Sequence, residues 1–142
     1  MIKFPKSQDY EYVSEFQHWF AAIENEWVDI LIPSKDTDNF PQQQYEFLQY
    51  AETVISDLIG FGHRYIQKFS NFDLQDGGLN AIRYNEFNGI PYIELQYNFE
   101  QDPEFLWSVG FEKNPLLGYS LDVQSSALDY GFTAIILHRE PN

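Results

Sequence analysis

The sequence contains no cysteine among its 142 residues, so disulfide bridges and thiolate metal sites are excluded. It also lacks any apolar run long enough to span a bilayer. The first residues, Met1 to Lys6, turn polar at once and do not form the apolar core of a signal peptide. We therefore expect a cytoplasmic protein without a membrane segment.

Basic residues are scarce. The chain has 8 Lys and Arg against 22 Asp and Glu, for a formal net charge of −14. Residues 7–34, 36–63 and 84–112 contain no Lys or Arg. A field of this sign disfavours nucleic acid and anionic membranes as partners and favours a basic protein. The same charge also serves simply to keep an aromatic-rich protein unassociated, which is the alternative reading.

Aromatic residues are abundant, at 18% of the chain, and hydrophobic residues make up 44%. Each buried aromatic side chain removes a large area from water. A chain of this length and composition buries a core without metal or disulfide support. The sequence therefore predicts a single globular domain over residues 1–142.

Alternating apolar and polar residues predict three successive antiparallel strands between Leu79 and Phe111. The Asn88-Gly89 pair suits the first hairpin connection, and Pro103 ends the second strand. In the second strand, alternation separates an apolar face from a polar face. The polar face carries Tyr92, Glu94, Gln96 and Asn98.

Apolar residues at spacings of three and four predict an amphipathic helix over residues 8–30. A second helix is expected from Asn39 to Ile59, ended by Gly60. The exposed side of the first helix would be a negative ridge, read either as a solvated face or as a binding surface. The ridge residues considered for binding are Glu11, Glu15, Glu26 and Asp29.

The remaining segments are assigned as strands. Residues 64–74 fit either a strand or an extension of the second helix, and a strand is favoured. Residues 117–123 and 132–138 are expected to form two further strands. The predicted fold class is α+β, with two N-terminal amphipathic helices packed on a mainly antiparallel sheet of four to six strands.

Candidates for chemistry are weak. Glu15 and His18 fit the Glu-x-x-His spacing of di-metal bundles, but the second copy and the further glutamates are missing. His63 is expected at a helix C-terminus, and His138 on the face of Phe132 near a strand end. No nucleophile or phosphate-loop motif occurs. We therefore predict no catalytic residue, no cofactor and no metal.

In its size, acidity, lack of cysteine and expected layout, the chain resembles the bacterial immunity proteins that neutralise polymorphic or contact-dependent growth-inhibition toxins. The resemblance is carried by the acidic ridge and by the sheet around Glu94. It implies a stoichiometric complex that occludes a basic toxin, often a nuclease. The partner-binding residues would be Glu11, Glu15, Glu26, Asp29, Tyr92, Glu94 and Gln96.

Two other function classes remain open. An acidic mimic of DNA that inhibits a nuclease would share this composition, although large aromatics interrupt the acids here. A small-ligand-binding or enzymatic domain would instead have a deep aromatic pocket with convergent polar groups.

Overall fold

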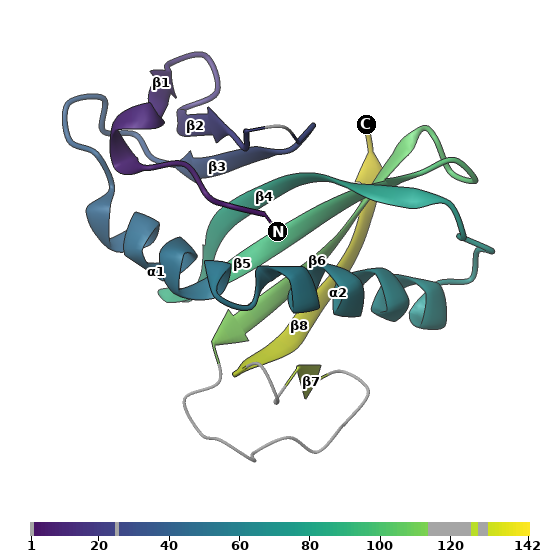
Figure 1. Cartoon of the computed structure of the whole chain (residues 1–142). Helices are drawn as coiled ribbons and strands as arrows, with labels where there is room; N and C mark the ends of the chain where they lie inside the picture. Colours follow the sequence, from purple (N-terminus) through teal and green to yellow (C-terminus); the bar gives the residue numbers. More distant parts are fainter. Residues whose placement is uncertain (1, 25, 114–125, 128–130) are drawn as a thin grey trace.

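The computed structural model describes residues 2–24, 26–113, 126–127 and 131–142. These residues form an α+β fold built on one mixed, mainly antiparallel sheet (Figure 1). The sheet has eight strands in the order β1-β2-β3-β4-β5-β6-β8-β7. The strands are β1 (Glu11–Val13), β2 (His18–Ala22), β3 (Asp29–Pro33), β4 (Gly77–Phe87), β5 (Ile90–Phe99), β6 (Phe105–Lys113), β7 (Ser126–Ala127) and β8 (Phe132–Pro141). The helices are η1 (Ser7–Asp9), α1 (Gln42–Glu52) and α2 (Ile55–Phe69).

The predicted fold class is wrong, because the helices are not N-terminal and the sheet has eight strands where four to six were expected. Residues 8–30 form three antiparallel strands after a single 3-10 turn, not a long helix. Gln17 has a positive φ of 51° in the turn between β1 and β2, which reverses the chain. Aromatic and β-branched side chains suit a pleated sheet better than a helix, and this segment is rich in them. The two α-helices therefore lie mid-chain, after three strands.

The second predicted helix is divided into two. α1 ends at Glu52 and α2 begins at Ile55. α2 then continues through Gly60 to Phe69, so the prediction of a strand over residues 64–74 is wrong. Its buried residues Leu58, Gly62 and Ile66 recur at helical spacing and face the sheet. Packing on the sheet overrides the helix-ending tendency of Gly60.

The three successive antiparallel strands predicted between Leu79 and Phe111, which form a meander, are confirmed. β4, β5 and β6 pair antiparallel in sequence, and Asn88 and Gly89 take positive φ values of 53° and 78° in the first hairpin. β8 pairs with β6, which confirms the strand predicted over residues 132–138. The strand predicted over residues 117–123 lies outside the described residues. β3 and β4 pair parallel, with both helices in the connection between them.

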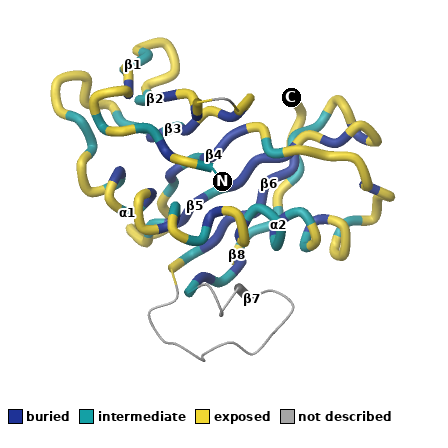
Figure 2. The backbone as a smooth tube through the Cα atoms, in the orientation of Figure 1, coloured by how far each residue is buried: buried dark blue, intermediate teal, exposed yellow. Residues whose placement is uncertain are grey.

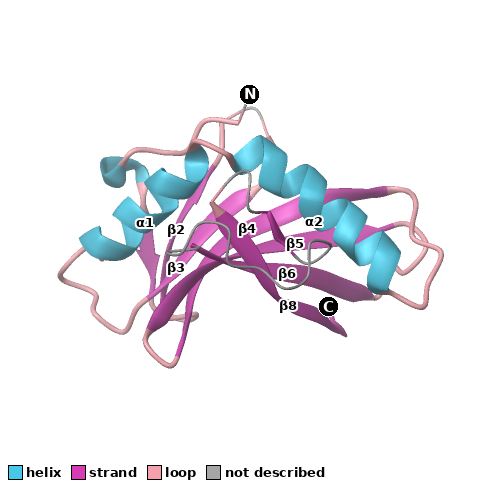
Figure 3. Cartoon of the chain, turned by 90° about the horizontal axis from the view of Figure 1, so that it is seen from below, coloured by secondary structure: helices cyan, strands magenta, loops and turns pink. Residues whose placement is uncertain are grey.

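Both helices cover the same face of the sheet (Figure 3). Inner-strand residues beneath them, such as Ile30, Ile82 and Leu95, are completely buried. The Tyr97 hydroxyl reaches from β5 to α2 and donates a hydrogen bond of 2.7 Å to the Ile59 carbonyl oxygen. Figure 2 shows the buried residues concentrated along the central strands, while the turns are exposed. Among the described residues, the core therefore lies between the helices and strands β2 to β6 and β8.

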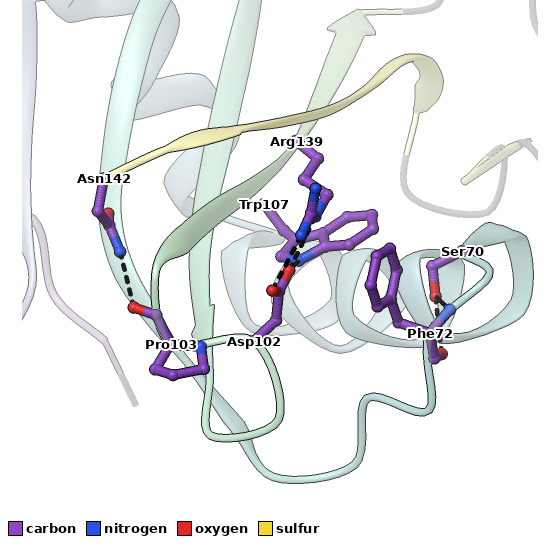
Figure 4. Close-up of polar contacts among 7 residues, drawn as sticks. All are labelled: Ser70, Phe72, Asp102, Pro103, Trp107, Arg139 and Asn142. Atoms are coloured by element: carbon purple, nitrogen blue, oxygen red, sulfur yellow. Dashed lines mark hydrogen bonds and ion pairs between the residues drawn. The ribbon is translucent and has the colours of Figure 1, made fainter.

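A clamp holds the C-terminal strand to the turn between β5 and β6 (Figure 4). The Asp102 carboxylate accepts hydrogen bonds from Arg139 Nε at 2.9 Å and Nη2 at 3.0 Å, and from Trp107 Nε1 at 2.8 Å. The Arg139 guanidinium also lies 3.4 Å from the ring centroid of Phe105 and 4.5 Å from that of Phe72. These contacts satisfy both charges within one compact cluster.

Candidate protein-binding surface

The candidate site is the sheet face turned away from the helices, which we call the open face (Figure 3). Strand alternation assigns its residues. Ile82 and Tyr84 on β4 belong to the core under α1, where Tyr84 contacts Phe47. Arg83, between them, therefore points to the open face. The pairing register then places one row on this face across β1 to β5, which we call the central row: Glu11, Phe20, Leu31, Arg83 and Glu94.

Tyr92, Glu94 and Gln96, the predicted meander residues, all lie on the open face. The Tyr92 ring packs against Gly110, where a Cβ atom would come within 2.9 Å of the ring. Burial, with the Glu94 charge beside it, raises the pKa of the Tyr92 phenol. The Gln96 amide donates a hydrogen bond of 2.8 Å to the Glu94 carboxylate. Tyr92 and Gln96 are buried and Glu94 is partly exposed.

The four acids assigned to a helical ridge are all exposed, but the ridge does not exist because their segment is not a helix. Glu11 and Asp29 lie on β1 and β3, and their register places both on the open face. Glu15 lies in the turn between β1 and β2. Glu26 lies in the connection between β2 and β3. The structure therefore brings Glu11 and Asp29 onto the same face as Glu94, and leaves Glu15 and Glu26 at opposite ends of the first hairpin pair.

Exposed apolar residues lie at one end of the sheet, and sequence reasoning missed them. Phe16 is 65% exposed in the turn between β1 and β2, and Phe87 and Ile90 are 63% and 48% exposed beside the turn between β4 and β5. The parallel pairing of β3 with β4 puts these two turns at the same end of the sheet. Phe16 also stacks on His18, with ring centroids 5.6 Å apart. We call Phe16, Phe87 and Ile90 the apolar end.

A second exposed aromatic, Trp27, lies at the other end of the sheet. Its side chain is 98% exposed in the connection between β2 and β3. Glu24, Glu26 and Asp29 are its exposed acidic neighbours in the sequence. This tip therefore combines a large apolar side chain with concentrated negative charge.

The histidines do not form a metal or catalytic centre with their neighbours. His18 lies on β2, and partial burial, followed by the nearby Arg83 charge, lowers its pKa. His63 is in the middle of α2, stacked 5.3 Å from the Phe99 ring, so its predicted place at a helix end is wrong. A register shift in the β6 to β8 pairing moves Ile136 and His138 to the open face, away from the side of Phe132. Within the described residues, no group of three or more His, Asp and Glu is placed to hold a metal ion.

Three surface hollows have volumes of about 480, 470 and 660 Å³. The first is lined by the turn around Gly77 and Glu100, the second by residues of the α1–α2 junction, and the third by the N-terminal segment beside Glu24. Phe99 and Phe4 are the aromatic residues in these linings. These hollows do not have the aromatic lining and convergent polar groups of a ligand pocket.

Comparisons with known proteins found no match to a family model, to a curated protein or to a solved structure. Among the residues that the structure describes, no helix is both long enough and apolar enough to cross a membrane.

Proposed function

We propose that this protein binds a basic protein through its open face, as an immunity protein binds its cognate toxin. The observation that carries the proposal is the apolar end, where Phe16 and Phe87 are each more than half exposed beside an acidic sheet face. Exposed large apolar groups with a polar surround mark protein interaction sites. Aromatic side chains are the usual anchors of such interfaces.

Charge supports a cationic partner. Lys35 is the only Lys or Arg between Ser7 and His63, the segment that includes β1, β2 and β3. In the sequence, its exposed acids include Glu15 beside Phe16, and Glu26 beside Trp27. A field of this sign raises the encounter rate with a basic protein to as much as ~10⁸ M⁻¹s⁻¹ at low salt, against ~10⁵ to 10⁶ for a neutral pair. Association is therefore steered, and the apolar contacts then slow dissociation.

The extent of the open face across several strands supports occlusion. A nuclease binds its substrate through a basic surface. An acidic face of several strands covers such a surface without entering a deep cleft. This supports a one-to-one complex in which the toxin cannot reach nucleic acid.

A DNA mimic is disfavoured by the central row. Between Glu11 and Glu94 the row carries Phe20, Leu31 and the cation Arg83. A phosphate backbone presents evenly spaced negative charge, and this row does not. The surface therefore suits a protein interface with mixed chemistry.

The test uses the protein encoded by the reading frame immediately upstream, purified and titrated into this chain by calorimetry. We expect a one-to-one complex that is weakened by Phe16→Ser with Phe87→Ser, because these variants remove the anchors. Phe69→Ser is the control, since Phe69 is 42% exposed but lies on α2. Equal affinity of the partner for the wild type, the double variant and the Phe69→Ser control would show that the apolar end is not part of the interface.

Charge reversal tests the steering separately. Glu11→Lys, Glu15→Lys and Glu26→Lys together should slow association and flatten its dependence on salt. Glu46→Lys, an exposed position on α1, is the control for net charge. If each reversed charge slows association as much on α1 as in the segment from β1 to β3, the net charge of the whole protein acts and not the acids of this segment.

A further inference from the structure

Trp27 differs from the other two tryptophans of the chain. Trp19 Nε1 donates a hydrogen bond of 3.3 Å to the Asp36 carbonyl oxygen, and Trp107 Nε1 donates one of 2.8 Å to the Asp102 carboxylate. The Trp27 side chain is 98% exposed and has no hydrogen bond or ring contact with any other described residue. Tryptophan is highly buried on average in folded proteins, and it is enriched among the residues that anchor protein interfaces.

The turn that carries Trp27 is fixed to the core on both sides. Ile23 and Val28 are 2% and 6% exposed, and the Ile23 N–H donates a hydrogen bond of 2.9 Å to the Val28 carbonyl oxygen. The Glu26 N–H donates to the Ile23 carbonyl oxygen at 3.1 Å. The backbone that presents the indole is therefore ordered before a partner arrives, which lowers the entropy lost on binding.

The carboxylates beside this indole are unpaired. Glu24, Glu26 and Asp29 accept no hydrogen bond and form no ion pair within the part of the chain that the structure describes. Lys3 and Lys6 line the same surface hollow as the two glutamates, but neither lysine forms an ion pair with a described carboxylate. The acids are therefore available to a cation from outside the chain.

Elsewhere in the molecule, cations lie over aromatic rings. The Arg139 guanidinium is 3.4 Å from the ring centroid of Phe105, and Lys113 Nζ is 4.2 Å from that of Tyr50. Tryptophan is the best aromatic partner for a cation, and the planar arginine side chain also stacks on the ring. None of the described Lys and Arg side chains lies over Trp27.

Glu24, Glu26 and Trp27, which we call the Trp27 tip, lie near enough to the apolar end for one protein to contact both. β2 runs from one to the other and has five residues, or roughly 16 Å at about 3.3 Å per residue. A standard protein interface covers about 800 Å² on each partner, which is roughly 28 Å across.

We propose that the Trp27 tip is the receptor for an arginine side chain of the basic protein that binds the open face. The guanidinium stacks on the indole, and the carboxylates of Glu24 and Glu26 balance its charge. The identity of the partner rests on the proposed function. The preference for arginine rests on the tip alone.

The first test titrates Trp27 variants with the protein encoded by the reading frame immediately upstream. We expect Trp27→Ala to raise Kd about 30-fold, as at an interface anchor. Trp27→Leu should raise Kd about tenfold, because leucine is apolar but has no ring for the guanidinium, and Trp27→Phe should cost less than either. Wild-type affinity in Trp27→Ala or in Trp27→Leu overturns the proposal and leaves the binding of a basic protein intact.

The second test needs no partner and follows the three indole N–H signals by NMR in the ¹⁵N-labelled full chain. The probes are acetyl-tetra-arginine amide and acetyl-tetra-lysine amide, at constant ionic strength. We expect a saturable shift of the Trp27 signal, with half-saturation at an about threefold or more lower concentration of the arginine peptide. The signals of Trp19 and Trp107 should stay in place, and they report that each variant is folded.

Charge variants complete the design. Glu24→Gln with Glu26→Gln should weaken the response to the arginine peptide more than the control pair Glu46→Gln with Asp57→Asn, which removes two exposed acids from α1 and α2. Equal responses to the two peptides, or equal losses in the two pairs of variants, overturn the proposal. A Trp27 signal that moves only with protein concentration or with phosphatidylcholine vesicles would also overturn it, because the tip would then bind a second copy or lipid. An arginine response without a complex with the upstream protein would contradict the proposed function alone.

Discussion

Replacing Gly62 by alanine tests the packing that leaves one sheet face open. Gly62 lies on α2 directly over Tyr97 of β5. An added Cβ falls inside contact distance of the Tyr97 hydroxyl oxygen and lies 3.2 Å from Cζ and 3.3 Å from Cε1 of the same ring. Tyr97 is 1% exposed, and its hydroxyl is held by Ile59. The ring therefore has little freedom to move aside.

The expected change in the free energy of unfolding is the sum of one stabilising and two destabilising effects. Glycine to alanine inside a helix normally stabilises by about 1 kcal/mol. Overpacking of a filled core costs about 1–3 kcal/mol. Displacing the buried hydroxyl from its acceptor costs about 1–3 kcal/mol more. We expect Gly62→Ala to lower the free energy of unfolding by about 1–5 kcal/mol, because the two costs exceed the helix gain.

Urea unfolding at equilibrium measures this, with an unchanged m-value as the sign that the native and unfolded states are comparable. Gly60→Ala is the matched control in the same helix. Its Cβ would meet only the flexible end of Arg64, 3.2 Å away, so this variant should be neutral or more stable by up to about 1 kcal/mol. The cost of Gly62→Ala should shrink in a Tyr97→Phe background. Equal stabilisation by both alanines would refute the placement of α2 on β5.

Three further results are expected. Hydrogen bonds from Arg139, opposed by burial and aided by Trp107, hold the pKa of Asp102 below its ordinary value of 3.8. A carboxylate whose pKa is lower in the folded state stabilises the fold above its unfolded-state pKa, and this stabilisation is lost as the pH falls through the folded-state pKa. At neutral pH the free energy of unfolding, measured in urea, should therefore be larger for the wild type than for Asp102→Asn. This difference should disappear only below about pH 4. An advantage that persists in strong acid would contradict the clamp. Trp27→Phe should change the free energy of unfolding by less than about 0.5 kcal/mol, because the side chain is almost fully exposed. Caesium should quench Trp27 fluorescence more efficiently than iodide, because Glu24 and Glu26 repel the anion. If both ions quench equally after correction for their quenching of free indole, the tip carries no local negative potential.

The meander was predictable because the alternation of apolar and polar residues there fits a strand and not a helix. In β5, apolar residues occupy every second position from Ile93 to Phe99, and the Asn88-Gly89 pair specifies the hairpin. Between Tyr12 and Ile30 the spacing of three and four coexists with short alternating runs, so periodicity alone favoured a helix. The pairing of β3 with β4 joins residues about 50 apart, and nothing local in the sequence specifies it. The length of α2 depends on how Gly62 fits Tyr97, which is also a tertiary effect.

The candidate site was predictable to the same degree. Alternation places Tyr92, Glu94 and Gln96 on one strand face whatever packs on the other. Phe16, Phe87 and Ile90 were missed because their exposure depends on where the helices lie, and an apolar residue in a turn is usually covered.

The central claim is that the open face, and not the helical face, meets a basic protein. Carbodiimide labelling of carboxylates, read by mass spectrometry in the free protein and in the complex, tests this most directly. We expect labelling of Glu11, Asp29 and Glu94 to fall on complex formation, and labelling of Glu46 and Asp57 on α1 and α2 to stay the same. Protection of Glu46 and Asp57, with Glu11, Asp29 and Glu94 still labelled, would contradict the claim.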